Sequence, residues 1–158
     1  IFEKQLQFKT DPTTDVTWMA DQGTMDGTGL YTAPKQSDSA KPGTRVLIRA
    51  ALKADPSISA VATITLVPFE LIAAYKEMAY DSSQEMTIDS SPPEGVELAA
   101  DYGTVDGLKY TTPSEAVAKE KGLSETVLTA KRKLKEGESE ADRELDKDTI
   151  IIKLKAQE

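Results

Sequence analysis

Two pairs of aspartates recur at the same spacing and are the residues with the clearest potential for metal chemistry. Asp21 and Asp26 are five residues apart, and Asp101 and Asp106 repeat this spacing in the second half of the sequence. Calcium is bound by about six to eight oxygens, which come from several carboxylates and carbonyls. Because each pair brings only two carboxylates, we expect these aspartates to form turns, and a calcium site is the alternative interpretation.

The sequence contains no histidine and no cysteine. These absences exclude the Ser-His-Asp and Cys-His mechanisms, disulfide bonds and cysteine zinc sites. A glycosidase would need two carboxylates in a cleft lined by aromatic side chains, but the chain has only three Phe, one Trp and five Tyr. We therefore predict that the protein is not an enzyme and that it has no catalytic, cofactor-binding or metal-binding residues.

Three glycines in the first half, Gly23, Gly27 and Gly29, superficially resemble a phosphate-binding loop. Such a loop ends in Lys followed by Ser or Thr and opens a helix, and neither feature follows here. We therefore expect turn glycines. We also expect Asp26-Gly27 and Asp106-Gly107 to supply the positive φ of two-residue hairpin turns.

The net charge of −8 comes from the second half of the sequence. Residues 1–67 carry seven basic and seven acidic residues, whereas residues 68–158 carry twelve basic and twenty acidic residues. An acidic surface repels phosphate groups, so we expect no nucleic-acid partner and no association with anionic membranes. The longest apolar stretch, residues 60–75, is interrupted by polar residues and proline, so we expect no membrane span either.

The strongest organisational signal is an internal repeat with a period near 80 residues. Val16–Gly27 recurs as Val96–Gly107, and Leu30–Pro34 returns as Lys109–Pro113 after the loss of one residue. Three further pairs of segments match: Gln5–Thr10 with Glu85–Ser90, Thr44–Ala50 with Ser124–Ala130, and, at an offset of 88, Ile64–Leu66 with Ile152–Leu154. We therefore predict two domains, residues 1–67 and residues 68–158.

Short alternating runs of apolar and polar residues dominate both repeats. The runs Leu6–Phe8 and Val46–Ala50 have a period of two, which is typical of half-buried antiparallel strands. Turn dipeptides separate the runs, and this pattern predicts a β-sandwich or a small barrel. In the second repeat we expect a helix of one or two turns in residues 114–121 and a strand over residues 125–133. A longer helix through residues 131–145 is the alternative.

One block of the first repeat carries a recognisable pattern. It reads Val-Thr-Trp at residues 16–18, Gly-Thr-Met-Asp at residues 23–26 and Gly-Leu-Tyr-Thr-Ala-Pro at residues 29–34. This block resembles the bacterial immunoglobulin-like domains of the group 2 kind. The second repeat departs from the pattern, since Leu98 stands in place of the tryptophan and Lys109 in place of the glycine-leucine pair.

The resemblance implies an all-β fold of two tandem immunoglobulin-like β-sandwiches, antiparallel and of the Greek-key type. It also implies a place in a surface-exposed, secreted or phage protein. The family is a scaffold, so the resemblance implies no ligand. Within the sandwiches we expect Trp18 in the core of the first repeat. Tyr31 and Tyr110 are expected at the sandwich edge, with hydroxyls that are bonded or hydrated.

The two repeats differ at their beginnings and near their ends. The first repeat lacks the opening strand that residues 69–75 provide in the second, so either Ile1-Phe2 is its remnant or something outside the chain fills the edge. The second repeat carries an acidic hairpin extension at residues 135–148, with three basic and seven acidic residues. We expect this extension to be solvated and mobile, and a cation or partner site is the alternative.

These features favour a non-catalytic structural or adhesion module. The junction Leu66–Glu70 lacks glycine and contains proline, which predicts a short, semi-rigid joint and an elongated tandem. We expect spacer or display domains of a larger bacterial cell-surface or secreted protein, located outside the cell. The expected contacts are a protein partner or neighbouring domains of the same protein. The first residue is not Met, which suggests an excised or processed fragment.

Two other functions remain open from the sequence. One is a decoration domain of a phage or a secretion apparatus. The other is a carbohydrate- or partner-binding accessory module of an extracellular enzyme. For a surface glycan, the only plausible aromatic platforms are Tyr75, Tyr80 and Tyr102.

Overall fold

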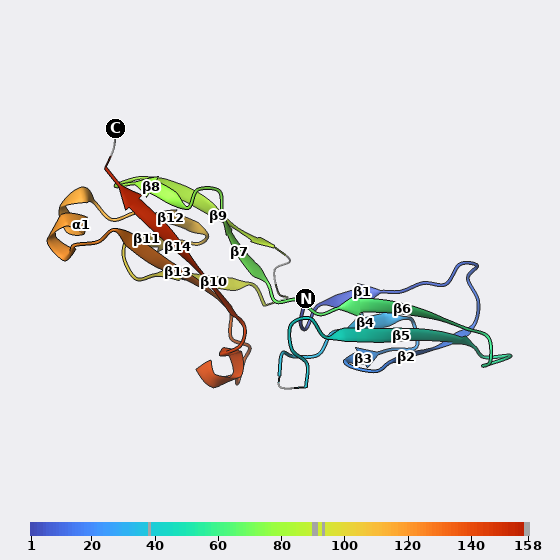
Figure 1. Cartoon of the computed structure of the whole chain (residues 1–158). Coiled ribbons are helices and arrows are strands. Elements are labelled where there is room, and N and C mark those ends of the chain that lie inside the picture. The colour runs from blue at the N-terminus through green and yellow to red at the C-terminus, as the bar shows by residue number, and fades with distance from the viewer. Residues whose placement is uncertain (38, 90–91, 93, 157–158) are drawn as a thin grey trace. The chain divides into compact units, whose positions relative to one another are not determined.

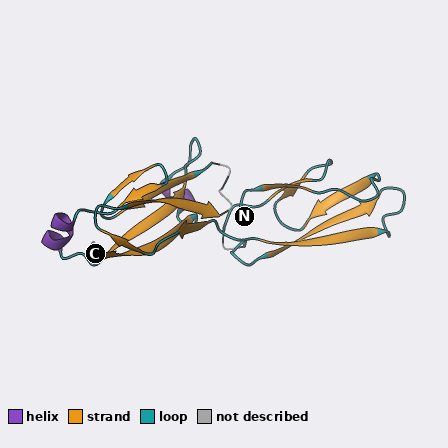
Figure 2. Cartoon of the chain, turned by 90° about the horizontal axis from the view of Figure 1, so that it is seen from above, coloured by secondary structure: helices purple, strands orange, loops and turns teal. Residues whose placement is uncertain are grey.

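The structure, a computed structural model, describes residues 1–37, 39–89, 92 and 94–156 of the chain. The chain divides into two compact units, Ile1–Pro68 and Phe69–Glu158. Strands make up nearly all of the regular structure in both units (Figure 2). Over the described residues the fold is mostly β, with four small sheets and one short α-helix.

The first unit contains two three-stranded sheets (Figure 1). Its strands are β1 (Gln5–Gln7), β2 (Val16–Ala20), β3 (Thr24–Met25), β4 (Leu30–Thr32), β5 (Arg45–Leu52) and β6 (Ser59–Thr65). One sheet has the order β1-β4-β3 and the other the order β2-β5-β6, and all of these neighbours are antiparallel. Burial alternates along β5 from Val46 to Ala50, because successive side chains of a strand point to opposite faces.

The second unit contains two four-stranded sheets. Its strands are β7 (Glu70–Ala73), β8 (Glu77–Ala79), β9 (Ser83–Asp89), β10 (Val96–Ala100), β11 (Thr104–Asp106), β12 (Lys109–Thr111), β13 (Glu125–Arg132) and β14 (Lys147–Lys155). The orders are β11-β12-β9-β7 and β10-β13-β14-β8. The expectation of purely antiparallel pairing is wrong at one place, because β8 runs parallel to β14. The chain crosses from the edge of one sheet at β7 to the edge of the other at β8.

The α-helix α1 (Glu115–Lys121) lies between β12 and β13 and confirms the short helix expected there. The side chain of Ser114 accepts a hydrogen bond from the Val117 N–H at its start, and Gly122 ends it in the left-handed conformation. The alternative of a long helix through residues 131–145 is wrong. That range holds the end of β13 and one 3-10 turn, η1 (Glu140–Arg143).

The two units repeat one order of strands, with β2 to β6 matching β10 to β14. The expected alignment of Gln5–Thr10 with Glu85–Ser90 is wrong by two residues. Leu6 lies opposite Tyr31 in the first unit, whereas the residue opposite the matching Tyr110 is Gln84. The structural offset here is therefore 78 residues. An apolar pattern of period two looks the same after a shift of two residues, so the pattern does not distinguish these registers.

Tyrosines, not the tryptophan, stand at the centre of the buried side chains. Tyr31 and Tyr110 are each 0% exposed, so the expected edge position is wrong. Each lies on a strand that is flanked by two others. Tyr31 packs in the core with Val46 and Ile48 of the opposite sheet. Trp18 is only half-buried and packs against the rim of the core, because β2 is an edge strand. The buried core of the first unit consists of Phe2, Tyr31, Ala33, Ala40, Val46, Ile48 and Leu66.

The first unit has no counterpart of β7 and β8 among its described residues. Ile1-Phe2 does not form the remnant of a strand. Phe2 instead buries its ring in the core. As a result β1 and β6 are edge strands, whereas their counterparts β9 and β14 each lie between two neighbours.

Candidate functional site

The aspartates considered for calcium bind the backbone of the protein itself. Oδ1 of Asp21 accepts a hydrogen bond from the Leu47 N–H at 2.9 Å. Oδ1 of Asp101 accepts the equivalent bond from the Val127 N–H at 2.8 Å. In both units this carboxylate fastens the turn after β2 or β10 to the adjacent long strand. Asp21 and Asp101 therefore stabilise turns, as expected from the sequence.

Asp26 organises the turn between β3 and β4. Its Oδ1 accepts bonds from the Thr28 N–H at 2.8 Å, the Thr28 hydroxyl at 2.7 Å and the Leu30 N–H at 2.9 Å. These hydrogen bonds, above all that from the Thr28 hydroxyl, lower the pKa of Asp26. The turn has four residues, so the expected two-residue turn is wrong here, and the positive φ of 87° falls on Gly29 instead of Gly27. In the second unit the turn does have two residues, but they are Gly107 and Leu108, because Asp106 ends β11 and pairs with Lys109. Of the expected pair, only Gly107 has a positive φ, of 60°.

Gly23 and Gly103 allow their turns to lie directly on the buried tyrosines. Their φ angles are 77° and 93°. A Cβ atom on Gly103 would lie 2.9 Å from the ring of Tyr110 and would collide with the carbonyl oxygen of Thr111. Gly23 has the same surroundings against Tyr31. These contacts explain the recurring glycine by packing alone and support the expected turn role.

The tyrosine hydroxyls differ between the two units. The Tyr110 hydroxyl donates to the carbonyl oxygen of Tyr102 at 3.1 Å. The Tyr31 hydroxyl is buried and has no hydrogen-bond partner among the described residues. Burial raises the pKa of both tyrosines.

The three tyrosines considered for sugar binding do not form one platform. Tyr75 is 67% exposed in the link between β7 and β8. It borders a hollow of about 700 Å³ together with residues such as Glu125, Ile151 and Lys153. Neither Tyr80 nor Tyr102 lines that hollow. A stacked sugar would therefore find a single aromatic ring there.

The acidic segment at residues 135–148 is anchored by a buried arginine, so the expectation of a solvated extension is wrong at its base. Arg132, at the end of β13, is 1% exposed. Its Nε donates to Asp146 Oδ2 at 2.8 Å, and its Nη1 donates to Glu138 Oε2 at 2.8 Å. Burial alone would lower the pKa of Arg132, but the hydrogen bonds to Glu138 and Asp146 outweigh it and raise that pKa.

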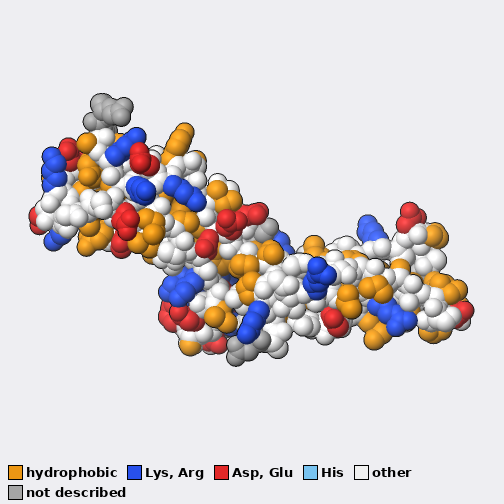
Figure 3. All heavy atoms as spheres, viewed as in Figure 1, with side chains coloured by type: hydrophobic (Ala, Val, Ile, Leu, Met, Phe, Trp, Pro, Cys, Tyr) orange, Lys and Arg blue, Asp and Glu red, His pale blue; other side chains and the backbone are white. Residues whose placement is uncertain are grey.

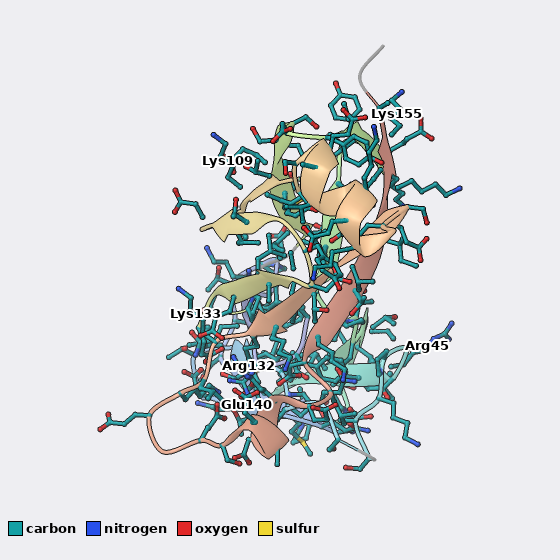
Figure 4. All side chains as sticks on the ribbon, turned by 90° about the vertical axis from the view of Figure 1, so that its left-hand side faces the viewer. Arg45, Lys109, Arg132, Lys133, Glu140 and Lys155 are labelled. Carbon is teal, nitrogen blue, oxygen red and sulfur yellow. The ribbon has the colours of Figure 1, made fainter. Side chains whose placement is uncertain are left out.

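A second buried arginine extends this cluster into η1. Arg143 Nη1 donates to Glu97 Oε2 and to the carbonyl oxygen of Arg132, both at 2.7 Å. Its other nitrogens donate to Glu140, and these bonds lower the pKa of Glu140. Figure 4 shows Arg132, at the end of β13, close to Glu140, the first residue of η1. Both arginines are neutralised by carboxylates of the same unit, so the cluster acts as a clamp on this segment.

The only feature of the sequence that we had used to interpret residues 135–148 was their acidic composition. Alternating Glu, Asp, Arg and Lys residues indicate charge but do not show which of them become buried. Arg132 occupies the position of Leu52 in the first unit, as the matching pairs with Val96 and Val16 show. An arginine at an inward position of a strand, followed by several acidic residues, was the observation that could have revealed it.

The first unit has an apolar groove that was not predicted as a site. It has a volume of about 480 Å³ and opens between residues 8–16 and the strands β5 and β6. Apolar side chains line most of it, including Phe8, Trp18, Ile48 and Val61. Figure 3 shows hydrophobic side chains at the surface of this unit.

Among the described residues, no group of three or more acidic, His or Cys side chains is placed to hold a metal ion. Over the same part of the chain, no helix combines the length and apolar character that crossing a membrane requires. No model of a known protein family matches the sequence, and no curated protein matches it.

Proposed function

We propose that this chain is a tandem pair of immunoglobulin-like β-sandwich modules with a structural role. The modules would serve as spacers or display elements in a larger bacterial cell-surface or secreted protein, outside the cell. The observation that carries the proposal is that one chain builds the same order of strands twice, with buried side chains in both units. Such a duplicated scaffold adds length without adding chemistry.

The distribution of buried residues supports the sandwich interpretation. In the first unit the core joins Tyr31 of one sheet to Val46 and Ile48 of the other. In the second unit Met86 and Tyr110 lie on one sheet, and Leu128 and Ile152 lie on the other. Two sheets whose inward side chains fill one interior constitute the sandwich architecture.

The use of the polar residues supports a non-catalytic role. Asp21, Asp26 and Asp101 accept hydrogen bonds from backbone N–H groups, so their carboxylates stabilise turns. The arginines of the second unit are held by its own carboxylates. The groove of the first unit is mainly apolar. Protein partners or neighbouring domains fit these surfaces better than a small polar substrate.

The mechanism of such a spacer is mechanical and rests on independent folding. Two fragments, residues 1–68 and residues 69–158, should each unfold cooperatively, as measured by circular dichroism during heating. Small-angle scattering of the whole chain should give an extended particle. A compact particle, or a fragment that unfolds without cooperativity, would contradict the spacer.

The carbohydrate-binding alternative makes a different prediction. A glycan array probed with the whole chain should give no binding if the function is structural. Binding that is lost in Tyr75→Ala and retained in Tyr102→Ala would instead favour a glycan-binding accessory. The hollow beside Tyr75 is the surface that this comparison tests.

A further inference from the structure

The groove of the first unit lies where the second unit holds a strand. In β9 the residues Ser83–Glu85 pair with β12, and Met86–Asp89 pair with β7. With the offset of 78 residues, β1 corresponds to the first of these stretches only. The counterpart of Met86–Asp89 is Phe8–Asp11, which pairs with no strand among the described residues. All four residues of Phe8–Asp11 line the groove.

The side chain that fills this space in the second unit is Leu71 of β7. Leu71 is 3% exposed and lies opposite Ile88. Its N–H donates to Asp148 Oδ2 in β14 at 2.7 Å. The counterparts of Ile88 and Asp148 are Thr10 and Ala60. Both line the groove, so the groove is the vacant equivalent of the Leu71 site.

Burial and composition agree with a strand acceptor. Phe8 is half-buried where its counterpart Met86 is buried, and Ile64 is half-buried where its counterpart Ile152 is buried. β6 has the sequence SAVATIT, with no charged residue and no proline. Exposed edge strands usually carry such residues to prevent pairing. β6 therefore lacks the residues by which an open edge usually avoids pairing with another strand.

We propose that this groove accepts one extended strand donated by a protein partner. The strand would run antiparallel to Phe8–Asp11, as β7 runs to Met86–Asp89. It would place apolar side chains at alternate positions into the groove, with a leucine-sized residue between Thr10 and Ala60. Main-chain hydrogen bonds to an open edge provide affinity in this mode of recognition, and the alternate side chains provide specificity. This inference does not depend on the spacer function.

The chain itself supplies the probe. A synthetic peptide with the sequence of residues 69–79, FELIAAYKEMA, is added to the whole protein, and amide hydrogen exchange is measured. At a peptide concentration ten times Kd, exchange in residues 8–11 and in β6 should slow about tenfold. A peptide with Leu71→Asp should give no protection, because this side chain points inward. A peptide with Ile72→Asp should still protect, because Ile72 is exposed.

Two variants of β6 provide the matched test on the protein. Ala60 and Thr63 are both exposed, but only Ala60 lines the groove. Ala60→Arg should abolish the protection by the peptide, and Thr63→Arg should retain it. Because both positions are exposed, neither variant is expected to prevent folding, which the far-UV circular dichroism and the thermal unfolding of each variant check.

Three outcomes would overturn the proposal. The first is the absence of protection in residues 8–11, or protection confined to β9 and β14. The second is a concentration-dependent dimer that Ala60→Arg dissociates, which would assign the groove to a second copy of the chain. The third is stabilisation only when the same eleven residues are fused directly ahead of Ile1, with no effect of the free peptide.

Discussion

The backbone N–H of Leu71 donates to Oδ2 of Asp148 at 2.7 Å, and this hydrogen bond joins the two sheets of the second unit. Leu71 lies in β7 at the edge of one sheet, whereas Asp148 lies in β14 of the other. The residue that corresponds to Asp148 in the first unit is Ala60, which has no side-chain acceptor. This hydrogen bond therefore depends on β7, which has no counterpart among the described residues of the first unit.

Asp148→Ala should destabilise the second unit. It leaves a partly buried N–H without its charged acceptor, which costs about 1–3 kcal/mol of unfolding free energy. Asp148→Asn retains an acceptor oxygen and should cost less. Urea unfolding followed by circular dichroism reports both units, whereas the fluorescence of Trp18 reports the first unit alone. A shift of the fluorescence transition would contradict the assignment of this effect to the second unit.

Gly103→Ala should destabilise the second unit by about 1–3 kcal/mol through backbone strain alone, and the collision with Thr111 adds to this cost. Gly27→Ala is the control, because Gly27 has no positive φ and no atom within 4 Å of an added Cβ. The control should change the unfolding free energy by less than about 0.5 kcal/mol. Equal thermal stability of Gly103→Ala and the wild type would show that the backbone at Gly103 is not packed tightly against Tyr110 and Thr111.

Tyr31→Ala should destabilise the first unit more than Trp18→Ala does. The loss of a fully buried aromatic ring costs about 3–5 kcal/mol, whereas the half-buried Trp18 should cost about 2 kcal/mol. The centroid of the Phe8 ring lies 6.3 Å from that of Trp18 and 6.4 Å from that of Tyr31. Either variant therefore retains Phe8 and loses one of its two aromatic neighbours. Thermal unfolding by circular dichroism compares the two. A larger loss of stability in Trp18→Ala than in Tyr31→Ala would show that Trp18, and not Tyr31, is the main aromatic residue of the core.

Acidification should weaken the clamp at residues 135–148. Hydrogen bonds from Arg143 lower the pKa of Glu140 from its ordinary value of 4.5. A group whose pKa is lower in the folded state stabilises the protein above its unfolded pKa, and this contribution is lost as pH falls through the folded value. The Tm of the second unit should therefore fall as the pH drops below the ordinary value of 4.5. Glu140→Gln should show a smaller fall, because it has already lost the titrating group.

Glu136→Gln is the control for this titration, since Glu136 is an exposed glutamate of the same segment. Its Tm should follow that of the wild type across the same pH range. A pH profile of Glu140→Gln that matches the wild type would mean that Glu140 does not contribute to the clamp.

Several features of the protein followed from the sequence alone, because they depend on local chemistry. Alternation in Val46–Ala50 predicts a strand with one buried face, and that strand is β5. The helix-forming residues after Ser114 and the glycine at 122 predict α1. The recurrence of one block 80 residues later predicts that the same order of strands appears twice. Each of these depends on residues that are close together in the chain.

Other features were decided by the tertiary structure, because they depend on which elements meet. The two-residue error in matching β1 to β9 arose because the apolar pattern has a period of two, and only the pairing with Tyr31 and Tyr110 fixes the register. The burial of Arg132 depends on Asp146 and Glu138, which reach it only when β13 and the following segment fold together. The groove depends on a missing neighbour. Whether a strand edge is covered is a property of the assembled sheets, so the sequence of the strand itself does not determine it.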